Sequence, residues 1–241
     1  ASANFEGSLY ALSAVLMDGD SGRVLYEKEG NVIRPMASTT KIMTTYVALK
    51  YGDLESTATV SKNTVSVPAD SSSAGLRLGD RLTLQDLLYG LMLPSGNDSA
   101  IAIAEQVSGS VEKFVELMNE EARKLGATNT HFVNPHGYQD KNHYTTAYDL
   151  YLIYKEAIKY DYFLDVVYTK EYSNSFTRKT SYSTYQIPCT YTTSVPFYTG
   201  LCSAPSHVEI MGGKSGYTEV ARRSYVVHAR ANGHDYICVV L

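Results

Sequence analysis

The segment Pro35-Met36-Ala37-Ser38-Thr39-Thr40-Lys41-Ile42-Met43-Thr44 places a serine and a lysine three residues apart, just after a proline that stops any strand and at the start of an apolar helix. Side chains at positions i and i+3 share one face of a helix, so Ser38 and Lys41 are expected to lie together. Apolar neighbours desolvate a lysine and lower its pKa, so that its amine accepts a proton near neutral pH. The segment therefore predicts a nucleophilic Ser38 in the first turn of a helix, with Lys41 as its base.

Two further motifs follow along the chain, Ser95-Gly96-Asn97 and Lys214-Ser215-Gly216, and they add hydroxyl, amide and cationic groups. Each motif is weak alone, because Ser-x-x-Lys recurs at Ser110 and Ser-x-Asn recurs at Ser2 and Ser61. At Ser110, which opens a charged helix, we interpret the serine as an N-cap. The three motifs in this order predict a serine acyl-transfer site whose base is a lysine.

Composition excludes several classes of protein. The 241 residues are 44% hydrophobic and 19% charged, as in an ordinary globular protein. A net charge of -4 without a run of basic residues argues against nucleic acid or an anionic membrane as partner. No stretch approaches the roughly 20 apolar residues of a membrane span. The N-terminal segment 1–4 carries no signal-peptide pattern.

The three cysteines leave their pairing open. Cys189 and Cys202 bracket a short Tyr/Thr/Pro segment and either close a disulfide or remain free thiols. Cys238 lies in an apolar run and is interpreted as a small buried hydrophobic residue.

The hydrophobic pattern predicts strands near both ends of the chain and helices between them. Strands are expected at 12–17, 23–27, 208–214, 223–230 and 236–241, with Asn232-Gly233 as a hairpin turn. Helices are expected at 38–49, 84–93, 98–107, 110–124 and 146–157. The segments 60–78 and 129–144 are expected to be mostly loop, and the polar segment 170–206 to hold short strands. The simplest arrangement pairs strands from both ends in one antiparallel sheet and packs the helices on it.

Other kinds of site were weighed against the serine site. Neutral imidazoles and carboxylates bind zinc, and the loop after residue 129 offers a zinc hydrolase alternative with His131, His136, Asp140 and His143, and Asp149 nearby. A nucleotide-binding loop around Lys214 is excluded, because the Walker pattern needs a glycine where Val208 stands. A Ser-His-Asp hydrolase is disfavoured, because no Gly-x-Ser-x-Gly segment is present.

At greater length, the motifs resemble those of the D-alanyl-D-alanine carboxypeptidases, the low-molecular-mass penicillin-binding proteins of the serine D,D-peptidase family. The similar segments are Pro35–Thr44, Leu93–Ala100, Gly213–Thr218, the linking stretch 125–137 and the pair Thr146-Ala147 with Asp149-Leu150. The resemblance implies an α+β fold of the serine β-lactamase/transpeptidase type, with a five-stranded antiparallel sheet and a helical lobe over roughly residues 38–160. It implies that residues 1–241 form a single catalytic domain. The β-rich second domain and the C-terminal membrane anchor common in the family are expected to be absent from this chain.

The resemblance also implies roles for individual residues. Ser38 attacks the carbonyl of the penultimate D-Ala, Lys41 is the base, Ser95 relays a proton to the leaving D-Ala, and Asn97 holds the substrate amide. Lys214 supplies positive charge, and four further residues line the substrate: Ser215, Gly216, Tyr217 and Thr218. No metal or cofactor is implied.

The implied substrate is a peptidoglycan stem peptide that ends in D-Ala-D-Ala, and β-lactams are expected to acylate the same serine. The implied location is extracytoplasmic, at the outer face of the bacterial cytoplasmic membrane or secreted, with membrane contact only through the absent C-terminal segment. A β-lactamase and a non-catalytic peptidoglycan or β-lactam sensor of the same fold remain as alternatives. Ser215 replaces the usual threonine, and the segment 170–206 does not match the family pattern well.

Overall fold

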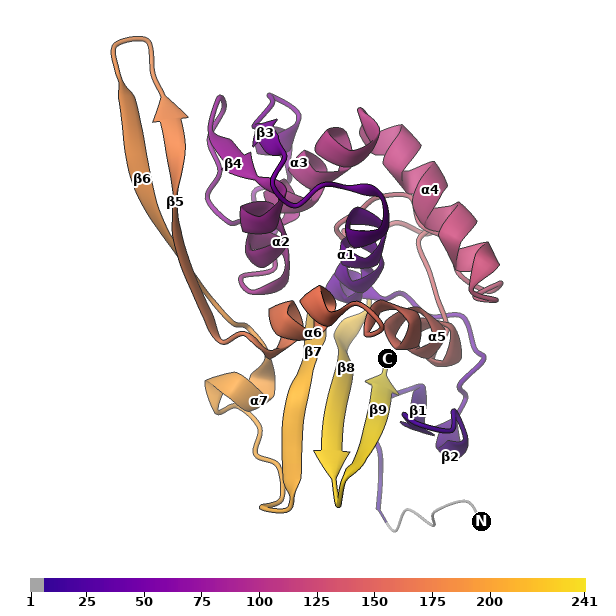
Figure 1. Cartoon of the computed structure of the whole chain (residues 1–241). Coiled ribbons are helices and arrows are strands. Elements are labelled where there is room, and N and C mark those ends of the chain that lie inside the picture. Colours follow the sequence, from indigo (N-terminus) through magenta and orange to yellow (C-terminus); the bar gives the residue numbers. More distant parts are fainter. Residues whose placement is uncertain (1–6) are drawn as a thin grey trace.

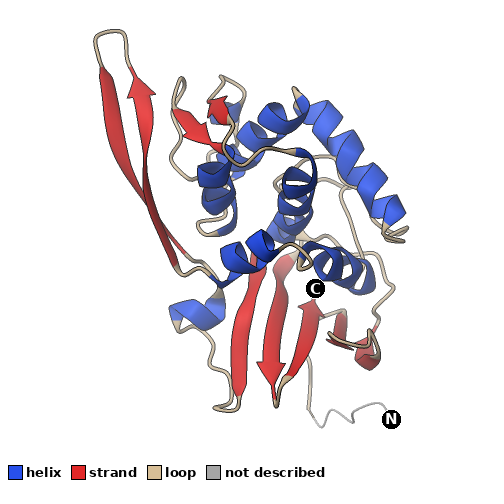
Figure 2. Cartoon of the chain, viewed as in Figure 1, coloured by secondary structure: helices blue, strands red, loops and turns tan. Residues whose placement is uncertain are grey.

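Two ends of the chain build one sheet. In the computed structural model, which describes residues 7–241, five antiparallel strands lie in the order β2-β1-β9-β8-β7. Their bounds are Ala14–Asp18 (β1), Val24–Lys28 (β2), Val208–Thr218 (β7), Arg222–Ala231 (β8) and His234–Val240 (β9). The predicted five-stranded antiparallel sheet is therefore confirmed, and Figures 1 and 2 show the helices gathered against one side of it. The occurrence of Ser-x-Asn at Ser2 and the N-terminal segment 1–4 lie outside the described residues.

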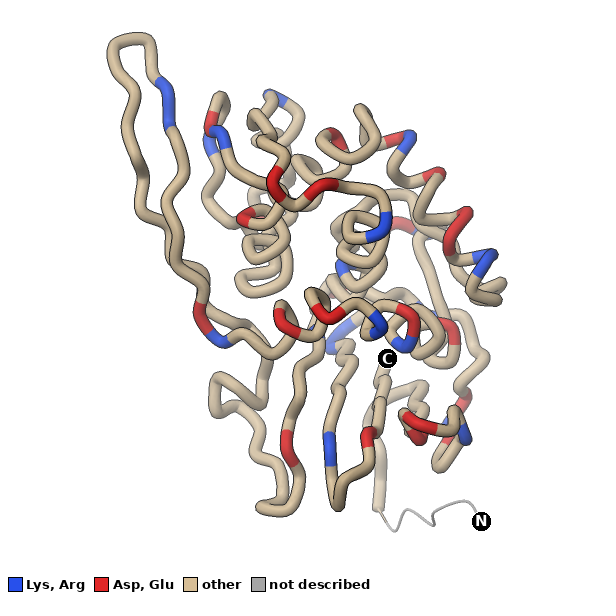
Figure 3. The backbone as a smooth tube through the Cα atoms, in the orientation of Figure 1, with Lys and Arg blue, Asp and Glu red and all other residues tan. Residues whose placement is uncertain are grey.

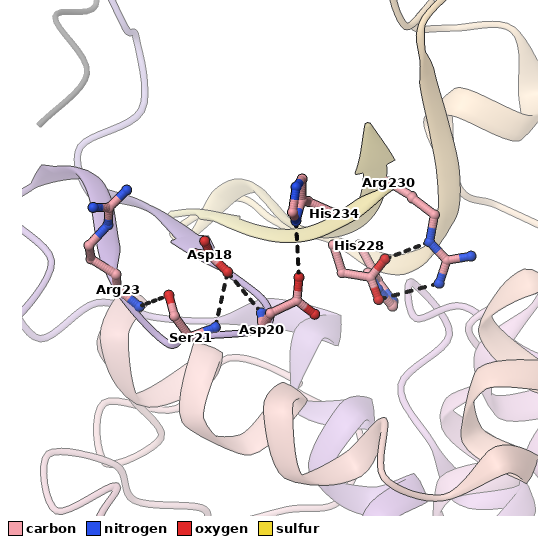
Figure 4. A network of polar contacts seen from close by, with 8 residues as sticks. Asp18, Asp20, Ser21, Arg23, His228, Arg230 and His234 are labelled. Carbon is pink, nitrogen blue, oxygen red and sulfur yellow. Dashed lines mark hydrogen bonds and ion pairs between the residues drawn. The ribbon is translucent and has the colours of Figure 1, made fainter. Parts of the chain in front are cut away.

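Tight turns join β8 to β9 and β1 to β2 at one end of this sheet. Asn232 and Gly233 join β8 to β9 with φ of 51° and 78°, the left-handed conformations that a two-residue hairpin requires. Beside this turn, Arg230 Nε donates to Asp235 Oδ1 at 2.7 Å, and His234 Nδ1 lies 3.6 Å from Asp20 Oδ2 (Figure 4). The first contact lies within the β8–β9 hairpin, and the second joins this hairpin to the β1–β2 turn, where Gly19 N also donates to the carbonyl of Asp235 at 2.7 Å.

Six helices, which come between β2 and β7 in the sequence, pack together as a lobe against the sheet. They are Thr40–Tyr51 (α1), Leu84–Met92 (α2), Asn97–Ser108 (α3), Val111–Lys124 (α4), Ala147–Ala157 (α5) and Asp161–Tyr168 (α6). Helix α1 is buried along most of its length and contacts each of the other five, so it is the centre of the lobe. Helix α6 was not predicted from the sequence.

Side-chain caps start three of the helices. Thr83 accepts a hydrogen bond from the backbone N–H of Asp86, whose carboxylate accepts the N–H of Thr83 in return, so a capping box starts α2. Ser110 caps α4 by accepting from Lys113 N at 3.2 Å, which confirms the interpretation of this Ser-x-x-Lys as a cap. Thr146 caps α5 in the same way.

The segment 170–206 is more regular than its sequence predicts. It forms a long hairpin, Glu171–Lys179 (β5) with Thr184–Thr192 (β6), and a short helix, Pro196–Thr199 (α7). The hairpin continues a second sheet, β3-β4-β5-β6, whose other strands are Thr57–Thr59 (β3) and Arg81–Thr83 (β4). Its base packs on α2, where the ring of Tyr172 stacks on that of Tyr89 and its hydroxyl donates to Asp86. Its tip extends beyond the helices, and β6 carries no charged side chain (Figures 1 and 3). Apolar side chains do alternate with polar ones in β6, at Ile187, Cys189 and Tyr191, but the many serine and threonine residues of the segment obscured this period.

All three cysteines are free thiols, so the disulfide alternative for Cys189 and Cys202 is not realised. Cys238 lies in β9 and is half-buried, so the expected burial is only partly met. Within residues 7–241, none of the helices is long and apolar enough to cross a membrane.

Candidate active site

The Ser38 turn lies where the chain enters α1. A single 3₁₀ turn, Ala37–Thr39 (η1), precedes the helix, and Ala37 takes a left-handed φ of 50°, which is uncommon for a residue with a side chain. Such a conformation persists only where surrounding contacts hold it, and it is typical of functional turns. Ser38 itself is half-buried and its side chain faces a cleft.

Lys41 lies against this serine as predicted. Its Nζ is 2.8 Å from Ser38 Oγ, and it donates at 2.8 Å to each of two further oxygens, Asn97 Oδ1 and the carbonyl of His136. A neutral amine has two protons and one lone pair. The two fixed acceptors therefore take both protons of a neutral Lys41, and its lone pair is directed at the hydroxyl of Ser38.

Burial favours this neutral form. Lys41 is fully buried, and burial, with a smaller effect of the charge on Lys214, holds the pKa of Lys41 well below its usual value. Lys214 is 1% exposed, and burial lowers its pKa to about 7. Near pH 7 these environments favour a neutral Lys41 and a partly charged Lys214. A base and a cationic anchor need this arrangement.

The second motif comes from the turn between α2 and α3. Ser95 has a φ of 64°, and its buried hydroxyl has no hydrogen-bond partner among residues 7–241. Asn97 is the first residue of α3, where it meets Lys41. The next residue, Asp98, accepts hydrogen bonds from Ser73 Oγ and from the backbone N–H of Ala74, and so ties the preceding loop to the site.

The third motif lies within β7, the edge strand of the five-stranded sheet. The strand runs through Lys214, Ser215 and Gly216 to Thr218, four residues past its predicted end. A Cβ on Gly216 would lie 2.6 Å from Ser38 N, so only glycine lets the strand pass this close to Ser38. Ser215 Oγ donates to the carbonyl of Ser194 at 3.4 Å, which joins β7 to the end of the hairpin.

The three motifs meet in one cleft, although 176 residues separate the first from the last in the chain. A cavity of about 730 Å³ is lined by Ser38 together with Ser95, Lys214, Ser215, Gly216 and Tyr217. A smaller cavity of about 350 Å³ shares Ser38 and adds Asn97 and Thr218. The candidate residues predicted from the sequence are thus all brought around Ser38, with Lys41 beneath it.

Gly137 closes the floor of this cleft. Its φ is 96°, and a Cβ there would lie 1.9 Å from the carbonyl oxygen of Ala37, so the turn Ala37–Thr39 must move if a side chain is added. We expect Gly137→Ala to lower the free energy of unfolding by about 3 kcal/mol, because backbone strain and overpacking add. Urea unfolding of the two proteins measures this difference. Gly109→Ala is the matched control, since Gly109 also has a positive φ but meets no atom within 4 Å.

Comparison with known proteins identifies the family. A model of the peptidase S11 family, described as D-alanyl-D-alanine carboxypeptidase, matches residues 1–241. D-alanyl-D-alanine carboxypeptidase DacF of Bacillus subtilis is 34% identical over 95% of this chain and 57% of its own length. DacB2 of Mycobacterium tuberculosis is 33% identical over 94% of this chain and 73% of its own. The crystal structure of the Streptomyces K15 DD-transpeptidase covers 99% of this chain and 92% of its own, with a TM-score of 0.89 and 32% identity.

The chain belongs to the S11 peptidase family. The penicillin-binding fold expected from the resemblance is confirmed by the match to the DD-transpeptidase. The chain spans about half the length of several curated relatives that it matches, such as 57% of DacF and 39% of the Haemophilus influenzae DacA.

The histidines of the loop 129–144 do not gather as a zinc site. No group of three His, Cys, Asp or Glu side chains converges as a metal site within residues 7–241, so the zinc alternative has no ligand set. His136 instead offers its backbone carbonyl to Lys41, and its buried ring accepts from Tyr138 N at 3.0 Å. Sequence reasoning missed this contact, because a backbone carbonyl leaves no residue-type signal.

Proposed function

We propose that this chain is the catalytic domain of a serine-type D-Ala-D-Ala carboxypeptidase, which removes the terminal D-Ala from peptidoglycan stem peptides. One observation carries the proposal: a fully buried lysine amine lies 2.8 Å from the hydroxyl of Ser38. Membership of the S11 family and the names of its relatives support the choice of substrate. Strands from both ends of the chain share one sheet, which supports treating residues 1–241 as one domain.

Acylation begins with the neutral amine of Lys41. Lys41 takes the proton of Ser38 as Oγ forms a bond to the carbonyl carbon of the penultimate D-Ala, and the carbonyl oxygen becomes an oxyanion. The N–H groups of Ser38 and Tyr217 are assigned to hold this oxyanion, since β7 passes directly beside Ser38 N. The carbon–nitrogen bond then breaks, and the amine of the leaving D-Ala takes a proton relayed through Ser95, a residue that lines the same cleft.

The substrate is held at both ends of the cleft. Charged Lys214 attracts the terminal carboxylate, which accepts the hydroxyl of Ser215, and Asn97 contacts the amide of the acyl part. Gly216 and Thr218 border the path of the peptide along β7. Water then hydrolyses the ester on Ser38 and restores the hydroxyl. β-Lactams carry a reactive amide and a carboxylate in the same relation, so they acylate the same serine.

The proposed location is extracytoplasmic, at the outer face of the cytoplasmic membrane or in a secreted form, because the stem-peptide substrate lies there. The family association with the cell wall supports this location.

The experiment that tests the proposal combines two measurements on the wild-type chain. A stem-peptide analogue ending in D-Ala-D-Ala should release D-Ala, while the matched peptide ending in L-Ala-L-Ala should not. Incubation with benzylpenicillin should add one penicilloyl mass, and peptide mapping should place it on the tryptic peptide that contains Ser38. A long-lived adduct with D-Ala release supports the carboxypeptidase. Rapid penicillin turnover supports the β-lactamase alternative, and an adduct without D-Ala release supports the sensor.

The pH dependence of kcat/KM should show two limbs. Activity rises with pH as Lys41 loses its proton, and it falls with pH as Lys214 loses the charge that attracts the carboxylate. Since kcat/KM reports the pKa values of the free enzyme, we expect the alkaline limb near pH 7, the pKa that burial gives Lys214. Steady-state kinetics with the stem-peptide analogue from pH 5 to 9 measure both limbs. A profile that stays flat to pH 9 would show that the charge of Lys214 is not needed.

A further inference from the structure

The peptide group between Ala37 and Ser38 is held from the side opposite the cleft. Its nitrogen is the Ser38 N–H assigned to the oxyanion, and its oxygen is the Ala37 carbonyl. Because a peptide group is planar and rigid, whatever fixes the carbonyl also aims the N–H. Thr40 Oγ1 donates to the Ala37 carbonyl at 2.8 Å, and the oxygen therefore has a defined partner within the same turn.

His143 determines the orientation of that threonine. The ring is 3% exposed, its Nδ1 lies 3.0 Å from the backbone nitrogen of Val133, and its Nε2 lies 2.7 Å from Thr40 Oγ1. The amide of Val133 only donates, so Nδ1 must accept and the proton of the neutral ring is on Nε2. Burial lowers the pKa of His143 to about 4, which keeps the ring neutral near pH 7.

The direction of the whole chain of hydrogen bonds follows from its two ends. Val133 N–H can only donate and the Ala37 carbonyl can only accept, so His143 Nε2–H donates to Thr40 and Thr40 O–H donates to Ala37. Hydrogen bonds in such a series polarise one another, so the Ala37 carbonyl draws electron density from the Ser38 N–H and makes it a better donor. The loop 129–144 thus contacts the start of α1 twice, at Thr40 through the His143 side chain and at Lys41 through the His136 carbonyl.

We propose that His143 is a positioning residue for acylation: through Thr40 it orients and polarises the peptide group whose N–H receives the oxyanion at Ser38. The inference rests on the proposed acyl-transfer function of this site. His143 contacts no reacting atom, and its effect is confined to the step in which negative charge develops on the substrate carbonyl. Loss of the contact should slow acylation and leave the initial, non-covalent binding of substrate unchanged.

Two substitutions separate this role from a structural one. His143→Gln keeps a donor near the position of Nε2 and loses the acceptor for Val133, whereas His143→Asn keeps the acceptor and loses the donor to Thr40. Both remove the ring from the same buried space beside Phe132. If the Thr40 contact matters, His143→Asn loses about 10- to 100-fold in the acylation rate constant with benzylpenicillin while His143→Gln stays within about threefold of the wild type. A residue that only braces the loop would give the reverse order.

The measurement is stopped-flow acylation over a range of penicillin concentrations, which separates the rate constant from the binding constant. Thr40→Val and Thr40→Ser test the same contact without altering the loop: the valine should slow acylation about as much as His143→Asn, and the serine should not. Equal rates for Thr40→Val and the wild type would overturn the proposal, even where a His143 variant fails to fold. If the wild-type protein is not acylated at Ser38, the proposed function itself is overturned. If the wild type is acylated and Thr40→Val is acylated at the same rate, only this inference is overturned.

Discussion

Replacing Ser38 with alanine is expected to abolish both D-Ala release and the penicilloyl adduct. Among residues 7–241, three oxygens lie 2.8 Å from Lys41 Nζ, and the substitution removes the hydroxyl. The other two are a side-chain amide oxygen and a backbone carbonyl, which do not form acyl bonds. Loss of a nucleophile in an acyl-transfer enzyme costs roughly a million-fold in kcat. Intact-mass analysis after incubation with penicillin, together with a D-Ala release assay, measures the effect.

Ser110→Ala is the matched control for this loss. It alters the second Ser-x-x-Lys of the chain, but Ser110 only caps α4 through Lys113 N. We expect it to lower the free energy of unfolding by about 1 kcal/mol and to leave the penicilloyl adduct intact. An adduct that survives in Ser38→Ala, or disappears in Ser110→Ala, would show that the wrong serine has been assigned.

The candidate site was more predictable from the sequence than the surrounding fold. Ser38 and Lys41 are neighbours through helix geometry alone, and periodicity predicted the terminal strands and most helices to within a few residues. The meeting of Lys214 with Ser38 depends on how β7 lies against the lobe. The order of the three motifs and the family resemblance predicted it, whereas periodicity could not, because contacts of such long sequence separation leave no local period.

The parts that the sequence did not predict have physical reasons. The hairpin of β5 and β6 has one partly buried apolar face, with Phe176, Ile187 and Tyr191, but the many serine and threonine residues around these positions obscured the period of two. His143 was first considered as a zinc ligand, because a histidine in a polar loop gives no indication of its hydrogen-bond partners. Its contact with Thr40 spans 103 residues. Tertiary contacts, rather than local propensity, determine which groups the His143 ring bonds.

Lys41→Met should be the second most damaging substitution in the site. Methionine keeps the volume and most of the unbranched chain of lysine, but it offers no lone pair to take the proton of Ser38. Loss of a general base costs up to about 10,000-fold, and we expect the acylation rate constant for penicillin to fall by about that factor, with little change in non-covalent binding. Stopped-flow acylation measures both quantities. A fall below tenfold would mean that another group takes the proton.

The pH dependence of stability gives an independent check on the same lysine. Burial lowers the pKa of Lys41 in the folded protein, so between that lowered pKa and its usual value near 10.5 the unfolded chain binds more protons than the folded one. The free energy of unfolding therefore rises with pH in this window, by about 1.4 kcal/mol per pH unit for each such lysine. Lys214 adds the same trend above about pH 7. Urea unfolding from pH 7 to 9.5 measures this slope of the free energy of unfolding against pH. In Lys41→Met the contribution of Lys41 should be lost and that of Lys214 kept. A slope equal to that of the wild type would mean that Lys41 is charged in the folded protein and cannot be the base.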